Sequence, residues 1–392
     1  MDALTTPSNW QKVRLGDVGK PCMCKRVMKH QTTRYGEIPF YKIGTFGNTA
    51  DAFISKKLFL EYKTKYSFPK KGDILISASG TIGRAVIYDG KPAYFQDSNI
   101  VWIDNDETLV KNDFLFYAYS NVKWDTEHTT ILRLYNDNFR NTLIPLPPLN
   151  EQIAIANVLS DVDHYLYSLD ALILKKESVK KALSFELLSQ RKRLKGFNQN
   201  WQRVRLGDIC EFGNGGAYET LIVENGDFKL ISLNSIDIDG NLKNTMKRVN
   251  FYDNSLKQDD IVMVLSDVAH GDFLGLCAVI PSNDYVLNQR MGRLRIRNDC
   301  INILFLRLYI NANQKYFKMQ GQGSSQLNLS KKAIEDFEIL LPPLNEQIAI
   351  ANILSALDHE IISLKNKKRQ FDNIKKALNH DLMSAKIRVL KK

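Results

Sequence analysis

The chain has 392 residues, a formal net charge of +11 at pH 7 and a hydrophobic content of 44%. This length favours two or three domains, and the composition is that of an ordinary globular protein. No run approaches the roughly 20 apolar residues of a membrane-spanning helix, and the N-terminus lacks a signal peptide's basic start and apolar run, so we expect a cytoplasmic protein without a membrane partner. The positive charge favours a polyanionic partner, most commonly nucleic acid.

In chain order, the first globular segment begins with WQKVRLGD at 10–17, and a helix-like run near 109–120 precedes an extended run into Pro147-Pro148. Its strand-like runs, bounded by turn residues, lie at 38–43, 73–79, 83–89 and 99–104. The second segment has its helix-like run near 302–316 and its strand-like runs at 228–236, 260–266, 274–280 and 292–297. We therefore expect two α+β segments built to one plan with different side chains.

An internal repeat relates the two segments. LPPLNEQIAIAN occurs at 146–157 and again at 341–352, WQKVRLGD is matched by WQRVRLGD at 201–208, and KKAL occurs at 180–183 and 375–378. Each half of the chain is therefore one unit, in which a globular segment precedes a shared segment.

The shared segment is predicted to be a long helix. A proline pair cannot lie inside a helix, Asn150 and Asn345 are good N-caps, and Glu151 and Glu346 suit the positive end of the helix dipole. The first helix is expected to end near 191–195, before Gly196. Spacings of three and four residues predict a coiled coil, most simply an antiparallel intramolecular pair, although a core helix or a homodimeric coiled coil would use the same pattern. The residues expected to pack between the helices are Leu159, Val162, Leu166, Leu169, Ile173, Leu354, Leu357, Ile361, Leu364 and Phe371.

Motifs for catalysis are scarce. The sequence contains neither a Gly-x4-Gly-Lys-Ser/Thr loop nor an Asn/Asp-Pro-Pro-Tyr/Phe run. Gly213-Asn-Gly-Gly216 lacks an acidic ribose partner, and His128 and His270 are isolated. Cys22 and Cys24 form one close pair with no second pair to complete a zinc site, so we expect no metal and reduced structural thiols. The sequence indicates a binding protein rather than an enzyme.

These features together resemble the specificity (S) subunit of type I restriction–modification enzymes. The resemblance covers essentially the whole chain and is carried by the Pro-Pro-Leu-Asn-Glu-Gln entries, the two Trp-x-x-Val-x-Leu-Gly-Asp openings and KGDILISASGTIG at 71–83. One departure is visible: the loop before the last strand has Gly323-Ser-Ser325 in the second half but His128-Thr-Thr130 in the first.

The resemblance implies an α+β fold with two target-recognition domains, at 1–148 and 197–343, and two long antiparallel spacer helices, at 149–196 and 344–392, related by a pseudo-twofold repeat. Each domain would read one half of a bipartite site in double-stranded DNA, and the helices would fix the gap. Two modification subunits, which use S-adenosylmethionine, would dock on the helices, and two restriction subunits, which use ATP and Mg²⁺, would join them. The chain itself would hold no cofactor.

Candidate DNA-binding residues follow from chemistry, because Lys and Arg bind phosphates, Arg or Lys reads guanine, and Asn or Gln reads adenine. In the first domain they are Lys25, Arg26, Lys29, Arg34, Arg84, Gln96, Ser98, Asn99 and Arg133. In the second they are Asn214, Tyr218, His270, Gln289, Arg290, Arg293, Ser324, Ser325, Gln326 and Asn328. Ile155, Val158, Ile350 and Ile353 are candidates for partner docking. A stand-alone DNA-binding scaffold or regulatory protein is the alternative, and a stand-alone nuclease or methyltransferase is a third possibility.

Overall fold

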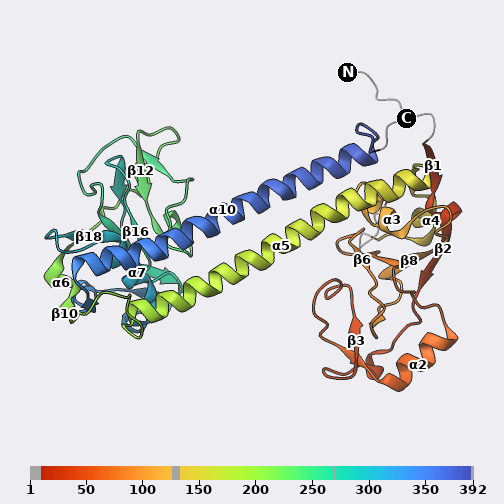
Figure 1. Ribbon diagram of the computed structural model, residues 1–392, viewed down its shortest axis with the longest axis horizontal. Coiled ribbons are helices and arrows are strands. Elements are labelled where there is room, and N and C mark those ends of the chain that lie inside the picture. Colours follow the sequence, from red (N-terminus) through yellow and green to blue (C-terminus); the bar gives the residue numbers. More distant parts are fainter. Residues whose placement is uncertain (1–9, 126–132, 269–270, 390–392) are drawn as a thin grey trace. The chain divides into compact units, whose positions relative to one another are not determined.

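The computed structural model describes residues 10–125, 133–268 and 271–389 and forms two compact units (Figure 1). Unit 1 comprises residues 1–170 and 366–392, and unit 2 comprises residues 171–365. Each unit holds one α+β domain, here called domain 1 (10–146) or domain 2 (201–341), and part of each of two long helices. None of the helices in the described ranges is long and apolar enough to cross a membrane.

Domain 1 contains a four-stranded sheet of order β2-β8-β5-β6, a three-stranded sheet of order β4-β3-β7 and the pair β1-β9. Its elements are β1 (Gln11–Arg14), α1 (Leu15–Val18), β2 (Gly19–Met23), β3 (Ile38–Tyr41), β4 (Phe53–Ile54), α2 (Lys56–Lys65), β5 (Ile74–Ser77), β6 (Ala85–Ile87), β7 (Tyr94–Phe95), β8 (Ile100–Asn105), α3 (Asn112–Tyr119), α4 (Asn136–Asn141) and β9 (Leu143–Leu146). The predicted runs are confirmed, whereas the sequence did not indicate the helices α1, α2 and α4 or the short strands β1, β2, β4 and β7.

Domain 2 repeats this plan with a four-stranded sheet of order β11-β18-β14-β16, a three-stranded sheet of order β13-β12-β17 and the pairs β10-β20 and β15-β19. Its elements are β10 (Gln202–Arg205), α6 (Leu206–Ile209), β11 (Cys210–Asn214), β12 (Phe228–Ile231), β13 (Arg248–Val249), β14 (Ile261–Val264), β15 (Ser266–Val268), β16 (Cys277–Val279), β17 (Tyr285–Leu287), β18 (Met291–Ile296), α7 (Ile303–Ala312), α8 (Gln314–Gln320), β19 (Gln326–Asn328), α9 (Lys331–Glu335) and β20 (Glu338–Leu341). The expected α+β class and internal repeat are confirmed.

The larger sheet of each domain is buried on both faces. In β5, Ile74 and Ile76 belong to one hydrophobic cluster and Leu75 to another, because successive side chains of a strand point to opposite faces. The first cluster of domain 1 also contains Leu159 from the start of one long helix and Leu382 from the end of the other. Both long helices therefore contribute to the core of the domain.

The long helices are α5 (Leu149–Leu188) and α10 (Leu344–Met383), and within each unit their segments run antiparallel. In unit 1, Lys368 Nζ lies 2.8 Å from Asp170 Oδ1, and in unit 2, Lys365 Nζ lies 2.8 Å from Glu177 Oε1. The residues predicted between the helices form their least exposed rows: Leu159, Leu166, Leu169, Ile173, Leu354 and Ile361 are buried, and Val162, Leu357, Leu364 and Phe371 are half-buried.

Three helix boundaries differ from the sequence expectation. The asparagines at 150 and 345 lie inside the first turn, because α5 and α10 begin one residue earlier, directly after the proline pairs. The helix α5 ends at Leu188 rather than near 191–195, because Gln190 adopts a left-handed conformation with φ of 61°. The basic run that follows is therefore a loop, and one of its arginines has a specific partner described below.

Candidate nucleic-acid interface

In domain 1, a polar cluster forms where three loops meet. Arg133 Nη2 donates to Ser98 Oγ at 2.8 Å and to the Ser98 carbonyl at 3.0 Å, and Ser79 Oγ donates to Asn99 Oδ1 at 2.8 Å. Ser79 also forms an isolated antiparallel β-bridge with Arg133. Three candidates that are up to 35 positions apart in sequence are thus brought together at one edge of the domain.

Two further candidates support the loops around this cluster. Arg84 Nη1 donates to the Phe46 carbonyl at 2.9 Å, and Gln96 Oε1 accepts from the Ile43 backbone N–H at 3.0 Å. Both side chains therefore hold the loop that follows β3. Arg84 is still exposed, so its other guanidinium nitrogens can reach a ligand.

The candidate cations Lys25, Arg26, Lys29 and Arg34 lie on loop 24–37, and all four are exposed. This loop adjoins the turn of the polar cluster, because Arg26 Nε lies 3.9 Å from Asp97 Oδ2. The separation is long and the arginine side chain is 74% exposed, so the pair contributes little to stability and leaves the guanidinium accessible.

In domain 2, the corresponding edge carries a pocket of about 500 Å³. Ser266 Oγ donates to Asn328 Oδ1 at 2.6 Å across the β15–β19 pair, at the position that Ser79 and Arg133 occupy in domain 1. Asn328 is shorter than Arg133, so this edge is less filled in domain 2. The pocket is lined by Leu233, Asn234, Ile236, Lys243, Val264, Ser266, Asp267, Val268, Phe273, Arg290, Ser325 and Gln326.

The two edges also share an unusual backbone feature. The turn between β7 and β8 contains Ser98 at φ of 53°, and the turn between β17 and β18 contains Arg290 at φ of 66°. A non-glycine residue in this region costs on the order of 1 kcal/mol or more, and such residues cluster at functional sites. Ala78 N–H donates to the Asn99 carbonyl just as Leu265 N–H donates to the Arg290 carbonyl, so both turns are attached to equivalent strands.

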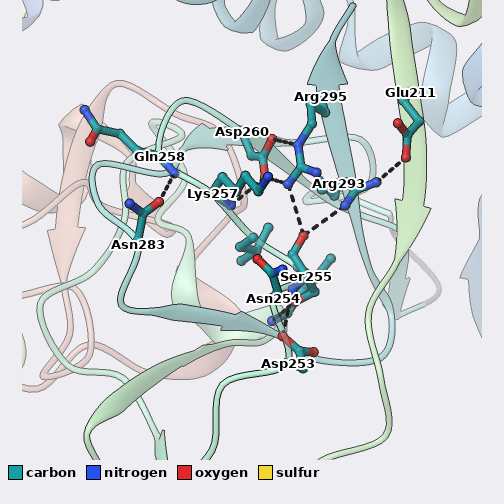
Figure 2. Close-up of polar contacts among 12 residues, drawn as sticks. Glu211, Asp253, Asn254, Ser255, Lys257, Gln258, Asp260, Asn283, Arg293 and Arg295 are labelled. Atoms are coloured by element: carbon teal, nitrogen blue, oxygen red, sulfur yellow. Dashed lines mark hydrogen bonds and ion pairs between the residues drawn. The ribbon is translucent and has the colours of Figure 1, made fainter.

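Other candidates of domain 2 lie outside the pocket. Arg293 Nη2 donates to Glu211 Oε1 at 2.6 Å and its Nη1 donates to the Ser255 carbonyl at 3.0 Å, next to the two-pronged pair of Arg295 with Asp260 (Figure 2). Arg293 thus joins a network that anchors the loop before β14.

Asn214 is exposed at the end of β11, and the Tyr218 hydroxyl donates to Asp253 Oδ2 at 2.9 Å. Gln289 hydrogen-bonds to Glu219 and is the main cause that lowers the pKa of that carboxyl. Ser324 is exposed beside Ser325, and His270 lies outside the described residues.

A buried glutamate at the start of each long helix is a feature that the sequence interpretation missed. Glu151 Oε2 accepts from Trp10 Nε1 at 3.1 Å and from Arg388 Nη2 at 2.7 Å. Glu346 Oε2 accepts from Trp201 Nε1 at 3.0 Å and from Arg193 Nη2 at 2.6 Å. We call each set, a tryptophan, a glutamate and an arginine, a helix-start junction. The signal was present in the sequence, since both tryptophans and both glutamates belong to the repeated motifs.

The next residue of the motif is also buried. Gln152 accepts from Lys111 N–H at 2.9 Å and donates to the Pro147 carbonyl at 2.8 Å, and Gln347 accepts from Asn302 N–H at 2.8 Å and donates to the Pro342 carbonyl at 2.8 Å. The repeated Glu-Gln pair therefore attaches the start of each long helix to the domain that precedes it.

The candidate docking residues divide by exposure. Ile155 and Ile350 are each only 1% exposed and belong to the domain cores, so the expectation that they form a docking surface is wrong. Val158 is half-buried and Ile353 is 38% exposed. The repeated motif instead exposes two other apolar positions in both copies, Leu149 with Leu344 and Ile153 with Ile348.

Three of the five cysteines, Cys24, Cys210 and Cys277, are buried free thiols. Burial raises the pKa of Cys24 and of Cys210 to about 12, so both remain thiols at neutral pH. Within the described ranges, no group of three or more His, Cys, Asp or Glu side chains lies close enough together to hold a metal ion.

Comparison with known proteins gives consistent matches. The family model of the type I restriction modification DNA specificity domain matches twice, at residues 7–176 and 198–371. The MjaVIII type I restriction enzyme specificity subunit of Methanocaldococcus jannaschii is 28% identical over 99% of this chain and 95% of its own length. A putative type I restriction enzyme specificity subunit of Haemophilus influenzae is 64% identical over 148 residues, and this match spans 38% of either chain.

Solved structures agree on the fold. The crystal structure of a type I restriction–modification S subunit from M. genitalium matches with a TM-score of 0.64 and 19% identity, over 97% of this chain and 98% of that one. A chain from a structure of type I restriction–modification complex assembly matches with a TM-score of 0.57 and 16% identity, over 97% of this chain and 99% of that one.

Proposed function

The chain belongs to the type I restriction–modification DNA specificity family, and from this premise we propose that it reads a bipartite DNA site for a multisubunit adenine methyltransferase and endonuclease. Each domain reads one half-site. The observation that carries this proposal is that two domains with different side chains place polar, accessible residues on the same edge, each with one strained non-glycine turn residue. A single chain can then read two different half-sites with one architecture.

We assign base reading to the residues that converge on these edges. Asn99 and Arg133 in domain 1, and Arg290 and Gln326 in domain 2, have the side chains that recognise adenine or guanine in the major groove. The remaining exposed cations position the duplex through its phosphates. Arg293 is the exception, because both Nη1 and Nη2 bond to internal partners, whereas Arg133 uses only Nη2 among the described residues.

We propose that α5 and α10 set the length of the gap between the two half-sites. Each has 40 residues, which corresponds to a rod of about 60 Å at ~1.5 Å per residue. Antiparallel packing and ion pairs between the helices make such a spacer stiff, whereas a flexible linker would allow many gap lengths. The half-sites are therefore read at one fixed spacing.

The repeated exposed residues support two docking sites for one kind of partner. In the identical 12-residue motif, the buried positions have structural roles, but Ile153 at 45% and Ile348 at 40% exposure have none. Identical exposed apolar residues in both halves are expected where two copies of one subunit bind. We identify these copies as the modification subunits, which would bring S-adenosylmethionine, joined for restriction by two motor–nuclease subunits that use ATP and Mg²⁺. This chain would need no cofactor and would act with the DNA in the cytoplasm.

The test is a base-resolution map of adenine methylation in the source cells with and without this gene. The expected result is the loss of one motif composed of two short half-sites around a fixed gap. Restoring the wild-type gene should return the motif, and restoring Arg290→Ala should return a motif relaxed at one position of one half-site. An unchanged map in a strain that methylates adenine and expresses the chain would contradict the proposal and favour a DNA-binding scaffold without an enzyme partner.

A further inference from the structure

Two equivalent peripheral regions of the domains carry opposite charge. In domain 1, the connection 24–37 between β2 and β3 has four basic residues and one acidic residue, for a formal charge of +3, and the connection 42–73 between β3 and β5 has seven lysines and three carboxylates, for +4. In domain 2, the matching connection 215–227 has three acidic residues and no Lys or Arg, for −3, and 232–260 has four basic and five acidic residues, for −1. The positive charge of these connections is thus specific to domain 1 and is not a consequence of the fold that the two domains share.

The positive charge of domain 1 is concentrated around α2, a helix between β3 and β5 for which the described residues of domain 2 offer no counterpart. One face of α2 is held by aromatic packing: Phe59 is 4% exposed and its ring centroid lies 5.6 Å from that of Phe68, and the Tyr62 ring lies 6.0 Å from that of Tyr94. Ser55 caps the helix by accepting from Leu58 N–H at 3.2 Å. The helix is therefore a fixed element of the domain.

The exposed side of α2, next to these aromatic contacts, presents lysines to solvent. Lys56, Lys57 and Lys63 are exposed, and among the residues that the structure describes none of them forms an ion pair, whereas Lys65 pairs with Glu61. Lys63 rests its stem on aromatic rings, with Nζ 5.3 Å from the Phe68 centroid. Exposed lysines without an ion pair among the described residues make this part of the surface positive, as is expected where a polyanion binds.

Loop 24–37 connects this lysine face to the polar cluster of domain 1. Gln31 Nε2 donates to the Tyr62 hydroxyl at 3.4 Å, and Lys25 Nζ lies 5.1 Å from the ring centroid of Tyr66. At its other side, Arg26 approaches Asp97, which adjoins Ser98 of the cluster. A basic surface thus runs from the candidate base-reading turn, over the loop, to α2.

We propose that loop 24–37 and α2 form a phosphate-binding surface that extends the DNA contact of domain 1 beyond its half-site, and that domain 2 has no such surface. This inference rests on the proposed function. It follows that the footprint on DNA is asymmetric, because domain 1 covers more flanking duplex and supplies most of the salt-dependent affinity. The acidic equivalents in domain 2 repel phosphates and lie off the duplex.

The test uses the full chain assembled with its modification subunits and a triple variant, Lys56→Gln/Lys57→Gln/Lys63→Gln. The dissociation constant for a duplex that holds the methylated motif is measured by fluorescence anisotropy over a range of salt concentrations. Each lost phosphate contact lowers the slope of log K against log salt by about 0.9, so the slope should become shallower by about 1 to 3. The methylated motif should stay the same, since phosphate contacts carry no base information.

A matched control removes the same charge elsewhere in unit 1, through Lys12→Gln/Lys367→Gln/Lys376→Gln, all exposed positions outside loop 24–37 and α2. A control slope equal to wild type together with a shallower slope for the α2 variant supports the proposal. Equal slopes for both variants and wild type overturn it while leaving the proposed function intact. Failure of the wild-type assembly to prefer the motif-bearing duplex would instead reject the proposed function itself. Thermal melting shows whether either variant has lost its fold.

Discussion

The indole of Trp201 donates a hydrogen bond to the fully buried carboxylate of Glu346 at 3.0 Å, across 145 positions of sequence. Trp10 makes the same bond to Glu151 at 3.1 Å. Each bond ties the first residue of a domain to the first turn of the helix that leaves that domain. The helix-start junction therefore fixes the start of each long helix against its own domain.

Removing the charge of this junction should destabilise unit 2. In Glu346→Gln the tryptophan bond survives, but the half-buried Arg193 loses its carboxylate partner, and breaking a buried ion pair costs about 3 kcal/mol. Urea denaturation should show this loss. As the control, Arg203→Gln breaks an exposed ion pair with Glu338 and should cost less than about 1 kcal/mol. Equal effects of the two substitutions would argue against a structural role for the junction.

The buried carboxylates Asp73 and Asp260 should respond oppositely to conversion to asparagine. Burial raises the pKa of Asp73, so its ionised form is disfavoured in the fold, and stability is lost as pH rises from its ordinary value of 3.8 through the folded pKa. Asp73→Asn should therefore raise Tm at pH 7, and the gain should shrink in acid.

Asp260 occupies the matching position, but both of its oxygens accept from Arg295, at 2.7 and 2.8 Å. Asp260→Asn should lower Tm at pH 7, because it leaves a guanidinium without its partner. Scanning calorimetry across pH measures both effects. A loss of Tm at pH 7 in both variants would contradict the assignment for Asp73.

Opposite charges should help set the antiparallel register of the helices. Lys368→Glu places a second carboxylate beside Asp170 and should lower the free energy of unfolding by less than about 1 kcal/mol. Adding Asp170→Lys should restore most of the loss, and a double-mutant cycle measures the coupling. Lys376→Glu, at an exposed position, serves as the control, and zero coupling would show that packing alone sets the register.

Gly83 should be indispensable to the loop that carries Arg84. Its φ is 82°, and a Cβ atom there would lie 2.0 Å from Trp124 Nε1, so Gly83→Ala must displace the loop. The expected outcome is loss of methylation at the site, because one half-site is no longer read. Gly44→Ala is the matched control, since a Cβ atom there meets no heavy atom within 4 Å. Normal methylation in Gly83→Ala would exclude this loop from recognition.

The repeated exposed isoleucines should control partner stoichiometry. Ile153→Ser and Ile348→Ser should each remove one modification subunit from the assembly, and the double variant should remove both, as read by native mass spectrometry. Tyr167→Ser is the control, because this tyrosine is 77% exposed but is not repeated in the second half. Full occupancy in the double variant would place the docking surface elsewhere. Thermal melting should be unchanged, since neither isoleucine is buried.

The sequence by itself determined the duplication, the positions of the main strand-like runs along each half and the two long helices with their apolar rows. These features follow from the local hydrophobic periodicity and from the proline pairs. Both act on neighbouring residues and do not depend on distant parts of the chain. The sequence did not determine which distant residues come together. Arg133 contacts Ser98, and Arg388 contacts Glu151, only because strand pairing and helix packing bring distant segments together. A lone arginine looks the same in sequence whether it is accessible, as Arg290 is, or engaged internally, as Arg293 is. Only the tertiary structure could decide between them, because burial and partnership depend on residues that sequence spacing does not relate.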